Sequence, residues 1–292
     1  MDHSPVIMGE VLFDCFGDDC NLGGAPFNVA WHLRGFGLAP RFISRVGADE
    51  NGIRVRNRML DWGLKTDWLE EDTEHPTGCV SVSVENGQPE YAILPAQAYD
   101  YIAAPNALGD CHNSLFYHGS LVARQEVSRT TLLNLRTAFT GRVFVDVNLR
   151  NPWWTLATLD PLISHASWLK LNEEELGHLL ANDDNASCLA REYNAEQVIL
   201  TRGDRGADVY NKMKHLYHAS PTAEAEIVDT VGAGDAFSAV VILGLIKGWE
   251  WPVILRCATG FAARVCSWRG ALTNDRTIYQ EILREWRGQS IR

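Results

Sequence analysis

The segment DTVGAGDAF, residues 229–237, places two aspartates and two glycines at the entrance to a strongly apolar stretch. The preceding AEIVD predicts a strand, and a helix is expected to begin within or just after GAGD. The first amides of a helix have no intrahelical partner, so those of residues 232–235 would point at one spot with the positive end of the helix dipole. Small residues let a phosphate reach the main chain there, and such a spot binds anions.

Asp235 is the candidate base of this site. An acidic residue in the first helical turn also stabilises the helix dipole without any catalytic role, and for this segment alone the two interpretations are evenly balanced. Asp229 could already serve the turn. A second carboxylate beside phosphate-binding amides therefore favours the removal of a proton from a hydroxyl that attacks the phosphate, which predicts phosphoryl transfer.

Two other apolar runs carry polar side chains near their ends. VDVNLR places Asp146, Asn148 and Arg150 at alternate positions, expected on one side of a strand near its C-terminal end. Arg150 could neutralise a transferring phosphate or a substrate carboxylate. The alternative is structural: Asp146 would form a surface ion pair with Arg150. Asp14 lies in the apolar run VLFDCF, and burying its charge is costly unless hydrogen bonds compensate. Sugar hydroxyls could supply these hydrogen bonds. The alternative is that Asp14 ends a strand and faces water.

The rest of the chain predicts one α/β domain with an inserted β-hairpin. From about residue 114, apolar strand runs alternate with helical segments, which is typical of a parallel sheet covered on both faces. Before residue 114, we expect a buried strand over 5–16, a helix that follows Gly23 and Gly24, a strand over 41–47 and a helix that ends near Gly63. A hairpin over 78–93 is expected to turn at Asn86 and Gly87. Towards the C-terminus, we expect an antiparallel pair over 206–220 and a buried helix over 236–248.

Composition limits the classes of function. The 292 residues contain 37 acidic and 26 basic side chains and a formal net charge of -11, which argues against general affinity for nucleic acid or anionic membranes and favours a small-molecule partner. The absence of a leader-like start and of a long apolar run predicts a cytoplasmic protein. The seven cysteines show no Cys-x-x-Cys spacing and are predicted to be buried thiols. No Gly-x-x-x-x-Gly-Lys-[Ser/Thr] loop occurs, so a nucleotide must be held otherwise.

With NLGGAPFNVAWHLRGFG near the N-terminus and ILTRGDRG before DTVGAGD, nearly the whole chain resembles the ribokinase or PfkB family of carbohydrate kinases. QPEYAILPAQAYDYI resembles its fructokinase-like branch. The resemblance implies a three-layer αβα fold with a mostly parallel central sheet. It also implies a single domain over 1–292 with a small β-lid formed by about 10–20 and 76–100, ATP and Mg²⁺ as cofactors, a possible K⁺, and a homodimer formed through the lids.

The resemblance also implies roles for individual residues. The base would be Asp235, with Gly232, Ala233 and Gly234 as the anion hole and Arg150 steadying the developing charge. The sugar would be held by Asp14, Gly23, Gly24 and Asn28. The nucleotide would lie along Lys170, Asn172, Thr201, Gly203, Gly206 and Thr259, the last standing where many relatives have Asn. Glu175 would help to hold Mg²⁺ through water; its structural alternative is a capping box with Asn172. A monovalent cation would be held by Asp229 and the carbonyl of Val231, near Gly270.

The predicted reaction transfers the γ-phosphate of ATP to a hydroxymethyl oxygen of a small sugar, with fructose as the first candidate. The closest alternative substrate is 2-keto-3-deoxygluconate, because Arg150 could meet its carboxylate. A catalytically silent sugar-binding regulator is a further alternative, which the intact Asp235 disfavours. A dinucleotide-dependent oxidoreductase is excluded because no Gly-x-Gly-x-x-Gly follows the first strand.

Overall fold

A nine-stranded, mostly parallel sheet forms the centre of the computed structural model, which describes residues 4–16, 19–85, 88–103, 114–180, 185–221 and 227–288. Its strands are β1 (Val6–Met8), β4 (Arg41–Gly47), β5 (Leu69–Asp72), β8 (Leu115–His118), β9 (Arg142–Asp146), β10 (Trp168–Asn172), β11 (Gln197–Thr201), β12 (Ala207–Asn211) and β13 (His215–Ala219). They lie in the order β13-β12-β11-β10-β9-β8-β1-β4-β5. The pair β12–β13 is antiparallel, as predicted for 206–220, and β11–β12 is antiparallel as well.

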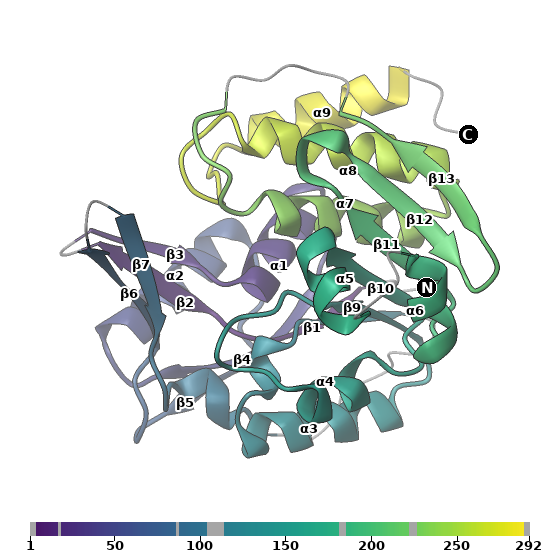
Figure 1. The fold of residues 1–292 in the computed structure, drawn as a ribbon. Coiled ribbons are helices and arrows are strands. Elements are labelled where there is room, and N and C mark those ends of the chain that lie inside the picture. The colour runs from purple at the N-terminus through teal and green to yellow at the C-terminus, as the bar shows by residue number, and fades with distance from the viewer. Residues whose placement is uncertain are drawn as a thin grey trace.

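Helices cover both faces of this sheet, and Figure 1 shows α7, α8 and α9 above it and α3 and α4 below it. One face packs against α1 (Ala25–Gly35), α2 (Glu50–Trp62), α7 (Ala233–Lys247), α8 (Trp251–Val265) and α9 (Arg276–Gly288), and the other against α3 (Glu126–Ala138), α4 (Leu156–Ile163), α5 (Glu173–Leu179) and α6 (Ala186–Glu192). Alternation along β1 sends Ile7 into the first core and Val6 and Met8 into the second. The predicted three-layer αβα architecture is confirmed.

A second, four-stranded sheet projects beside the body, at the left of Figure 1. Its strands β2 (Leu12–Phe16), β3 (Asp19–Gly23), β6 (Gly78–Glu85) and β7 (Gln88–Ile93) lie in the order β3-β2-β6-β7. The hairpins β2–β3 and β6–β7 are antiparallel, whereas β2 and β6 pair in parallel. This sheet is the predicted lid, and the predicted turn at residues 86–87 lies outside the described residues.

The prediction of one strand over residues 5–16 is wrong, because the chain passes there from one sheet to the other. β1 ends at Met8 in the central sheet and β2 begins at Leu12 in the lid. Gly9 lies against the ring of Pro26, where a Cβ atom would come within 2.2 Å of Cγ. The segment 9–11 is therefore fixed against the start of α1, with Glu10 at its centre.

The prediction that the cysteines are thiols is wrong for one pair. Cys15 and Cys20 are direct partners across the β2–β3 hairpin and form a disulfide, with their Cα atoms 4.1 Å apart. The pairing depends on the hairpin register, which the spacing of five residues did not reveal. Cys79, Cys188, Cys257 and Cys266 lie outside this disulfide, and of these four only Cys257 is buried as predicted. Within the described ranges, none of the helices combines the length and apolar character needed to cross a membrane.

Candidate active site

The candidate residues gather at the carboxyl end of the central sheet. β1 lies between β4 on one side and β8 on the other, so the strand order changes direction at β1. Ligands of open α/β sheets bind at such a switch point, beyond the carboxyl ends of the strands. Glu10 follows β1 there, Asp146 ends β9 and Asn172 ends β10.

Helix α7 begins at Ala233 with Gly232 as its N-cap, as predicted. Two constraints require glycine at position 232. Its φ of 81° lies in the left-handed region, and a Cβ atom would lie 2.3 Å from Cβ of Ala271. The close approach of the segment that contains Ala271 therefore fixes the start of the helix.

The first amides of α7 are mostly free. Within the described residues, no hydrogen bond engages the N–H groups of Gly232, Gly234 or Asp235, whereas that of Ala233 donates to the carbonyl of Thr230 at 3.3 Å. Ala233 thus departs from the expectation that all four amides lack partners. The free amides, together with the positive end of a 15-residue helix, form an anion-binding position.

Asp235 stands in the first turn of α7 and is only partly exposed. Nδ2 of Asn28 donates to its Oδ2 at 2.7 Å. The pKa of Asp235 is raised from 3.8 to about 6, chiefly by burial and also by the charge of Asp146, against the lowering effects of Asn28, Lys170 and Arg150. A carboxylate with a pKa near neutrality is suited to accept a proton from an alcohol during phosphoryl transfer.

The four predicted sugar-binding residues lie together beside Asp235. A Cβ atom on Gly23 would lie 3.3 Å from Oδ2 of Asp14 and 3.9 Å from Oδ1 of Asn28, so both side chains meet above that glycine. Oδ1 of Asn28 is buried without a hydrogen-bond partner among the described residues. Gly24, with φ of 107°, lies against the carbonyl of Glu10. Burial raises the pKa of Asp14, and the charge of Arg150 partly offsets this shift.

Asp146 pairs with Lys170 and not, as the alternative held, with Arg150. Nζ of Lys170 donates to both carboxylate oxygens at 3.0 Å, and Oγ of Ser238 in α7 donates to Oδ2 at 2.8 Å. The pair is buried, and burial disfavours an unpaired charge far more than a paired one. A Cβ atom on Gly234 would lie 3.4 Å from this Nζ, so the lysine places a positive charge beside the free amides.

The expectation that Asn148 and Arg150 continue the strand of Asp146 is wrong. β9 ends at Asp146, and Asn148 adopts a left-handed φ of 39°. Arg150 is exposed beyond that turn, yet its charge lowers the pKa of both Asp14 and Asp235. The charge of Arg150 therefore acts on both the sugar side and the base.

The predicted capping box between Asn172 and Glu175 is confirmed at the start of α5. Oδ1 of Asn172 accepts from the Glu175 amide at 2.9 Å, and Oε2 of Glu175 accepts from the Asn172 amide at 2.8 Å. Oε1 of Glu175 also accepts from the amide of Leu149, a long-range contact that no sequence pattern indicated. Glu175 thus holds the segment that carries Arg150.

Three of the predicted nucleotide residues lie around the end of β11. Thr201 donates its hydroxyl to the carbonyl of Leu171 at 3.3 Å. Gly203 is exposed at the turn that follows. Gly206 needs its small size, because φ is 91° and a Cβ atom would lie 2.0 Å from the carbonyl oxygen of Ala219. The loop is therefore a fixed turn next to Asn172, its strand neighbour.

Thr259 is buried in α8 and has no free donor. Its hydroxyl donates to the carbonyls of Leu255 and Arg256 at 2.9 and 3.2 Å, one turn back along its own helix.

Asp229 joins the loop before α7 to the loop after α8. Its Oδ1 accepts from the amide of Val231 at 3.0 Å and its Oδ2 from that of Gly270 at 2.9 Å, so Gly270 is nearby as expected. Across the described ranges, no group of three or more His, Cys, Asp or Glu side chains is arranged to hold a metal ion.

Sequence reasoning did not single out Glu10, Tyr99 or Arg124, all of which the structure places near this site. The side chains of these residues are buried, and each has a polar atom without a hydrogen-bond partner among the described residues. Burial raises the pKa of Glu10 to about 7, and its carboxyl group feels the charges of Arg150, Asp235 and Arg124. Only the acidic residue in the apolar run VIMGEVLF could have indicated this cluster.

Free amides at a helix start, an adjacent carboxylate and a β-lid over the switch point define a phosphotransferase that acts on a sugar hydroxyl. Residues 8–278 match the model of the pfkB family carbohydrate kinases, and the chain belongs to that family. It is 30% identical over 237 residues to a fructokinase from Escherichia coli, covering 76% of each chain.

Solved structures show the same fold. A sugar kinase from Pyrococcus horikoshii superposes with a TM-score of 0.84 at 24% identity, covering 98% of this chain and 99% of that one. A fructokinase from Vibrio cholerae O395, with fructose, ADP and calcium bound, gives a TM-score of 0.81 at 24% identity, covering 97% and 100%. These likenesses agree with the central sheet and the lid described above.

Proposed function

We propose that this protein is an ATP-dependent kinase that phosphorylates a hydroxymethyl oxygen of a small sugar, with fructose as the leading substrate. The observation that carries the proposal is the 2.7 Å hydrogen bond between Asn28 and Asp235, which unites the sugar side with the base beside the free amides. The fructokinase from E. coli supports fructose, and the V. cholerae structure with fructose and ADP supports a site for sugar and nucleotide in this fold.

In the proposed mechanism, Asp14 and Asn28 orient the sugar, and Asp235 accepts the proton of the attacking hydroxyl. The free amides of Gly232 and Gly234 stabilise the charge that develops on the transferred phosphoryl group. Lys170 lies beside Gly234, and the charge of Arg150 reaches Asp235, so both add to this stabilisation. Preorganised donors of this kind need no rearrangement during the reaction.

Lys170, Asn172, Thr201, Gly203, Gly206 and Thr259 are proposed to lie along the nucleotide. Bound Mg²⁺ would supply further neutralisation of phosphate charge. Glu175 would hold it through water, and the residue fits this role because each carboxylate oxygen accepts one amide and keeps a second lone pair. The carbonyl of Val231 and the carboxylate of Asp229 would hold a monovalent cation. Measuring the reaction rate at increasing potassium concentration tests this assignment.

We also propose a cytoplasmic homodimer formed through the lids. β3 and β7 are the edge strands of the lid sheet, and an unpaired strand edge is a template for pairing with a second copy. Size-exclusion chromatography with light scattering gives the mass in solution, and a monomer at all concentrations contradicts the dimer.

The acceptor is tested by measuring ADP formation from ATP with fructose, other ketoses and aldoses, 2-keto-3-deoxygluconate and nucleosides. We expect fructose to give the highest kcat/KM and a product phosphorylated at a hydroxymethyl carbon. Preference for 2-keto-3-deoxygluconate would assign the exposed Arg150 to a substrate carboxylate. Sugar binding without any turnover would make the protein a regulator instead.

A further inference from the structure

A buried polar cluster lies where the chain crosses between the body and the lid. Glu10 lies in the crossing from β1 to β2, and Tyr99 and Asp100 belong to the short 3-10 helix η1 (Ala98–Tyr101) that follows β7. Arg124 follows β8 and the short 3-10 helix η2 (Leu121–Ala123) and reaches the crossing after β7. Its Nη2 donates to the carbonyl of Leu94, just beyond β7, at 2.6 Å.

Arg124 is held in one orientation. Its Nε and Nη2 donate to the two carboxylate oxygens of Asp100 at 2.7 Å, and its side chain is 1% exposed. The guanidinium lies 5.0 Å from the ring centre of Tyr99 and 4.5 Å from that of Trp153. A bidentate ion pair between two aromatic rings fixes the plane of the guanidinium, and hence the direction of its remaining nitrogen.

Three polar atoms of this cluster have no protein partner within the described ranges. They are Nη1 of Arg124, Oη of Tyr99 and Oε2 of Glu10, on side chains that are nearly or fully buried. Leaving a buried donor or acceptor unpaired costs about 1–3 kcal/mol, so three such atoms together are a poor arrangement for stability alone. A bound molecule with hydroxyl groups would satisfy them.

The cluster adjoins the proposed sugar site. The carbonyl of Glu10 lies against Gly24, and the carboxyl group of Glu10 feels the charges of both Asp235 and Arg124. The contact with Gly24 therefore places the segment that carries Glu10 beside the proposed sugar site.

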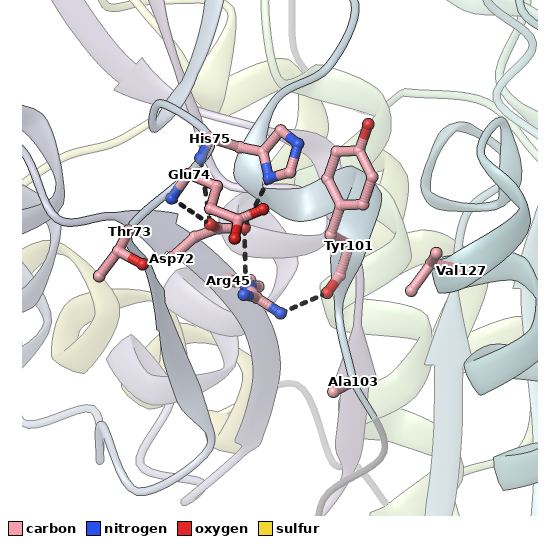
Figure 2. Close-up of a pocket in the computed structure, with 8 residues that line it drawn as sticks. All are labelled: Arg45, Asp72, Thr73, Glu74, His75, Tyr101, Ala103 and Val127. Atoms are coloured by element: carbon pink, nitrogen blue, oxygen red, sulfur yellow. Dashed lines mark hydrogen bonds and ion pairs between the residues drawn. The ribbon is translucent and has the colours of Figure 1, made fainter.

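The neighbouring pocket of about 280 Å³ at the base of the lid offers no comparable groups. Figure 2 shows Arg45 and His75 directed at Asp72, and Arg45 also donates to the carbonyl of Tyr101. Arg45, Asp72 and His75 thus already bind one another. Tyr101 thus anchors η1 on this side, while Tyr99 and Asp100 contact Arg124 on the other.

We propose that Glu10, Tyr99 and Arg124 bind hydroxyl groups at the end of a neutral sugar acceptor remote from the transferred phosphoryl group. The inference rests on the proposed sugar kinase function and adds the substrate class. The charge of Arg124 is already balanced by Asp100, and above a pH of about 7, where Glu10 is ionised, its carboxylate would repel that of an acid sugar. Sugar hydroxyls both donate and accept, which matches the fixed donor of Arg124, the carboxyl group of Glu10 and the hydroxyl of Tyr99.

Two conservative variants separate binding from stability. Tyr99→Phe and Glu10→Gln each remove or neutralise an atom that has no protein partner, so we expect an unchanged or higher Tm. Calorimetry without nucleotide should show the Kd for fructose rising about tenfold in each. Tyr279→Phe is the matched control, because the buried hydroxyl of Tyr279 does have a protein partner, Nδ1 of His32 at 2.9 Å. This variant should lower the Tm and leave the Kd for fructose unchanged.

The same variants test the charge argument. Glu10→Gln should reduce the preference for fructose over 2-keto-3-deoxygluconate, because the amide no longer repels a carboxylate. If wild type prefers another neutral sugar, the choice of fructose fails and the variants are measured with that sugar. An unchanged Kd in both variants overturns the inference, as does a wild type that binds the acid sugar and no neutral one.

Discussion

Nδ2 of Asn28 and Oδ2 of Asp235 lie 2.7 Å apart and join helices α1 and α7 across 207 positions of the chain. The other end of the same amide, Oδ1, is buried near Asp14 and unpaired among the described residues. One side chain thus holds the base with its nitrogen and presents its oxygen toward the sugar side. The geometry couples acceptor binding to the orientation and ionisation of Asp235.

This coupling predicts a pH effect for Asn28→Ala. The hydrogen bond from Asn28 lowers the pKa of Asp235, which burial raises to about 6. Without the bond the pKa rises further, and because the base acts when ionised, the acidic limb of the kcat profile should move to higher pH. Asn274→Ala, which removes an exposed amide bonded to Arg58, is the control and should leave the limb in place. An unmoved limb in Asn28→Ala contradicts the coupling.

Asp235→Asn should stabilise the folded protein at neutral and alkaline pH. The pKa of Asp235 is higher in the folded state, at about 6, than its usual 3.8, so ionisation above pH 6 opposes folding. We expect a gain of about 1–3 kcal/mol in the free energy of unfolding at pH 8 and almost none near pH 2.8, where the carboxyl is about nine-tenths protonated even in the unfolded state. Urea unfolding at the two pH values measures this, and an equal change at both would refute it.

Gly232→Ala should damage the start of α7. The substitution strains a φ of 81° and brings a Cβ atom to within 2.3 Å of Ala271. Gly248→Ala is a matched control, because Gly248 caps the other end of the same helix with φ of 69° and open space around it.

Both variants should lose about 1 kcal/mol or more of stability from the backbone strain. Only Gly232→Ala should also lose about 10²-fold in kcat, through displacement of the amides. Similar kcat values for the two variants would show that the amides do not take part.

Lys170→Met should be strongly destabilising, because it leaves Asp146 buried without its partner. The expected loss is about 3–5 kcal/mol, and the double variant Lys170→Met with Asp146→Asn should recover much of it. Both should raise the KM for ATP, because the positive charge beside Gly234 is gone in each. Recovery of the ATP KM in the double variant would assign the lysine a purely structural role.

Local patterns predicted the layers, the lid strands and the glycine-led helix well, because each depends on periodicity or on a few neighbouring residues. The break in residues 5–16 was missed because VIMGEVLFDCF is apolar apart from Glu10 and Asp14, whereas the crossing is fixed by contacts of Gly9 with Pro26 and of Gly24 with the carbonyl of Glu10. The Cys15–Cys20 disulfide required the register of a hairpin.

Long-range partners were beyond sequence reasoning. The pairing of Asp146 with Lys170 depends on the order of β9 and β10, and the position of Arg124 depends on where β7 ends relative to β8. The motif residues Asp14, Gly23, Asn28 and Asp235 were identified and do converge, because each sits next to a local signal for a strand end or a helix start.

The most direct test of the account is the turnover of Asp235→Asn under saturating ATP and fructose, with sugar binding measured by calorimetry on the same preparation. Loss of the base should reduce kcat by about 10²–10⁴-fold while the Kd for fructose stays within a few-fold of wild type. A kcat close to that of wild type, with the fold and the Kd intact, would contradict the assignment of Asp235 as the group that accepts the proton.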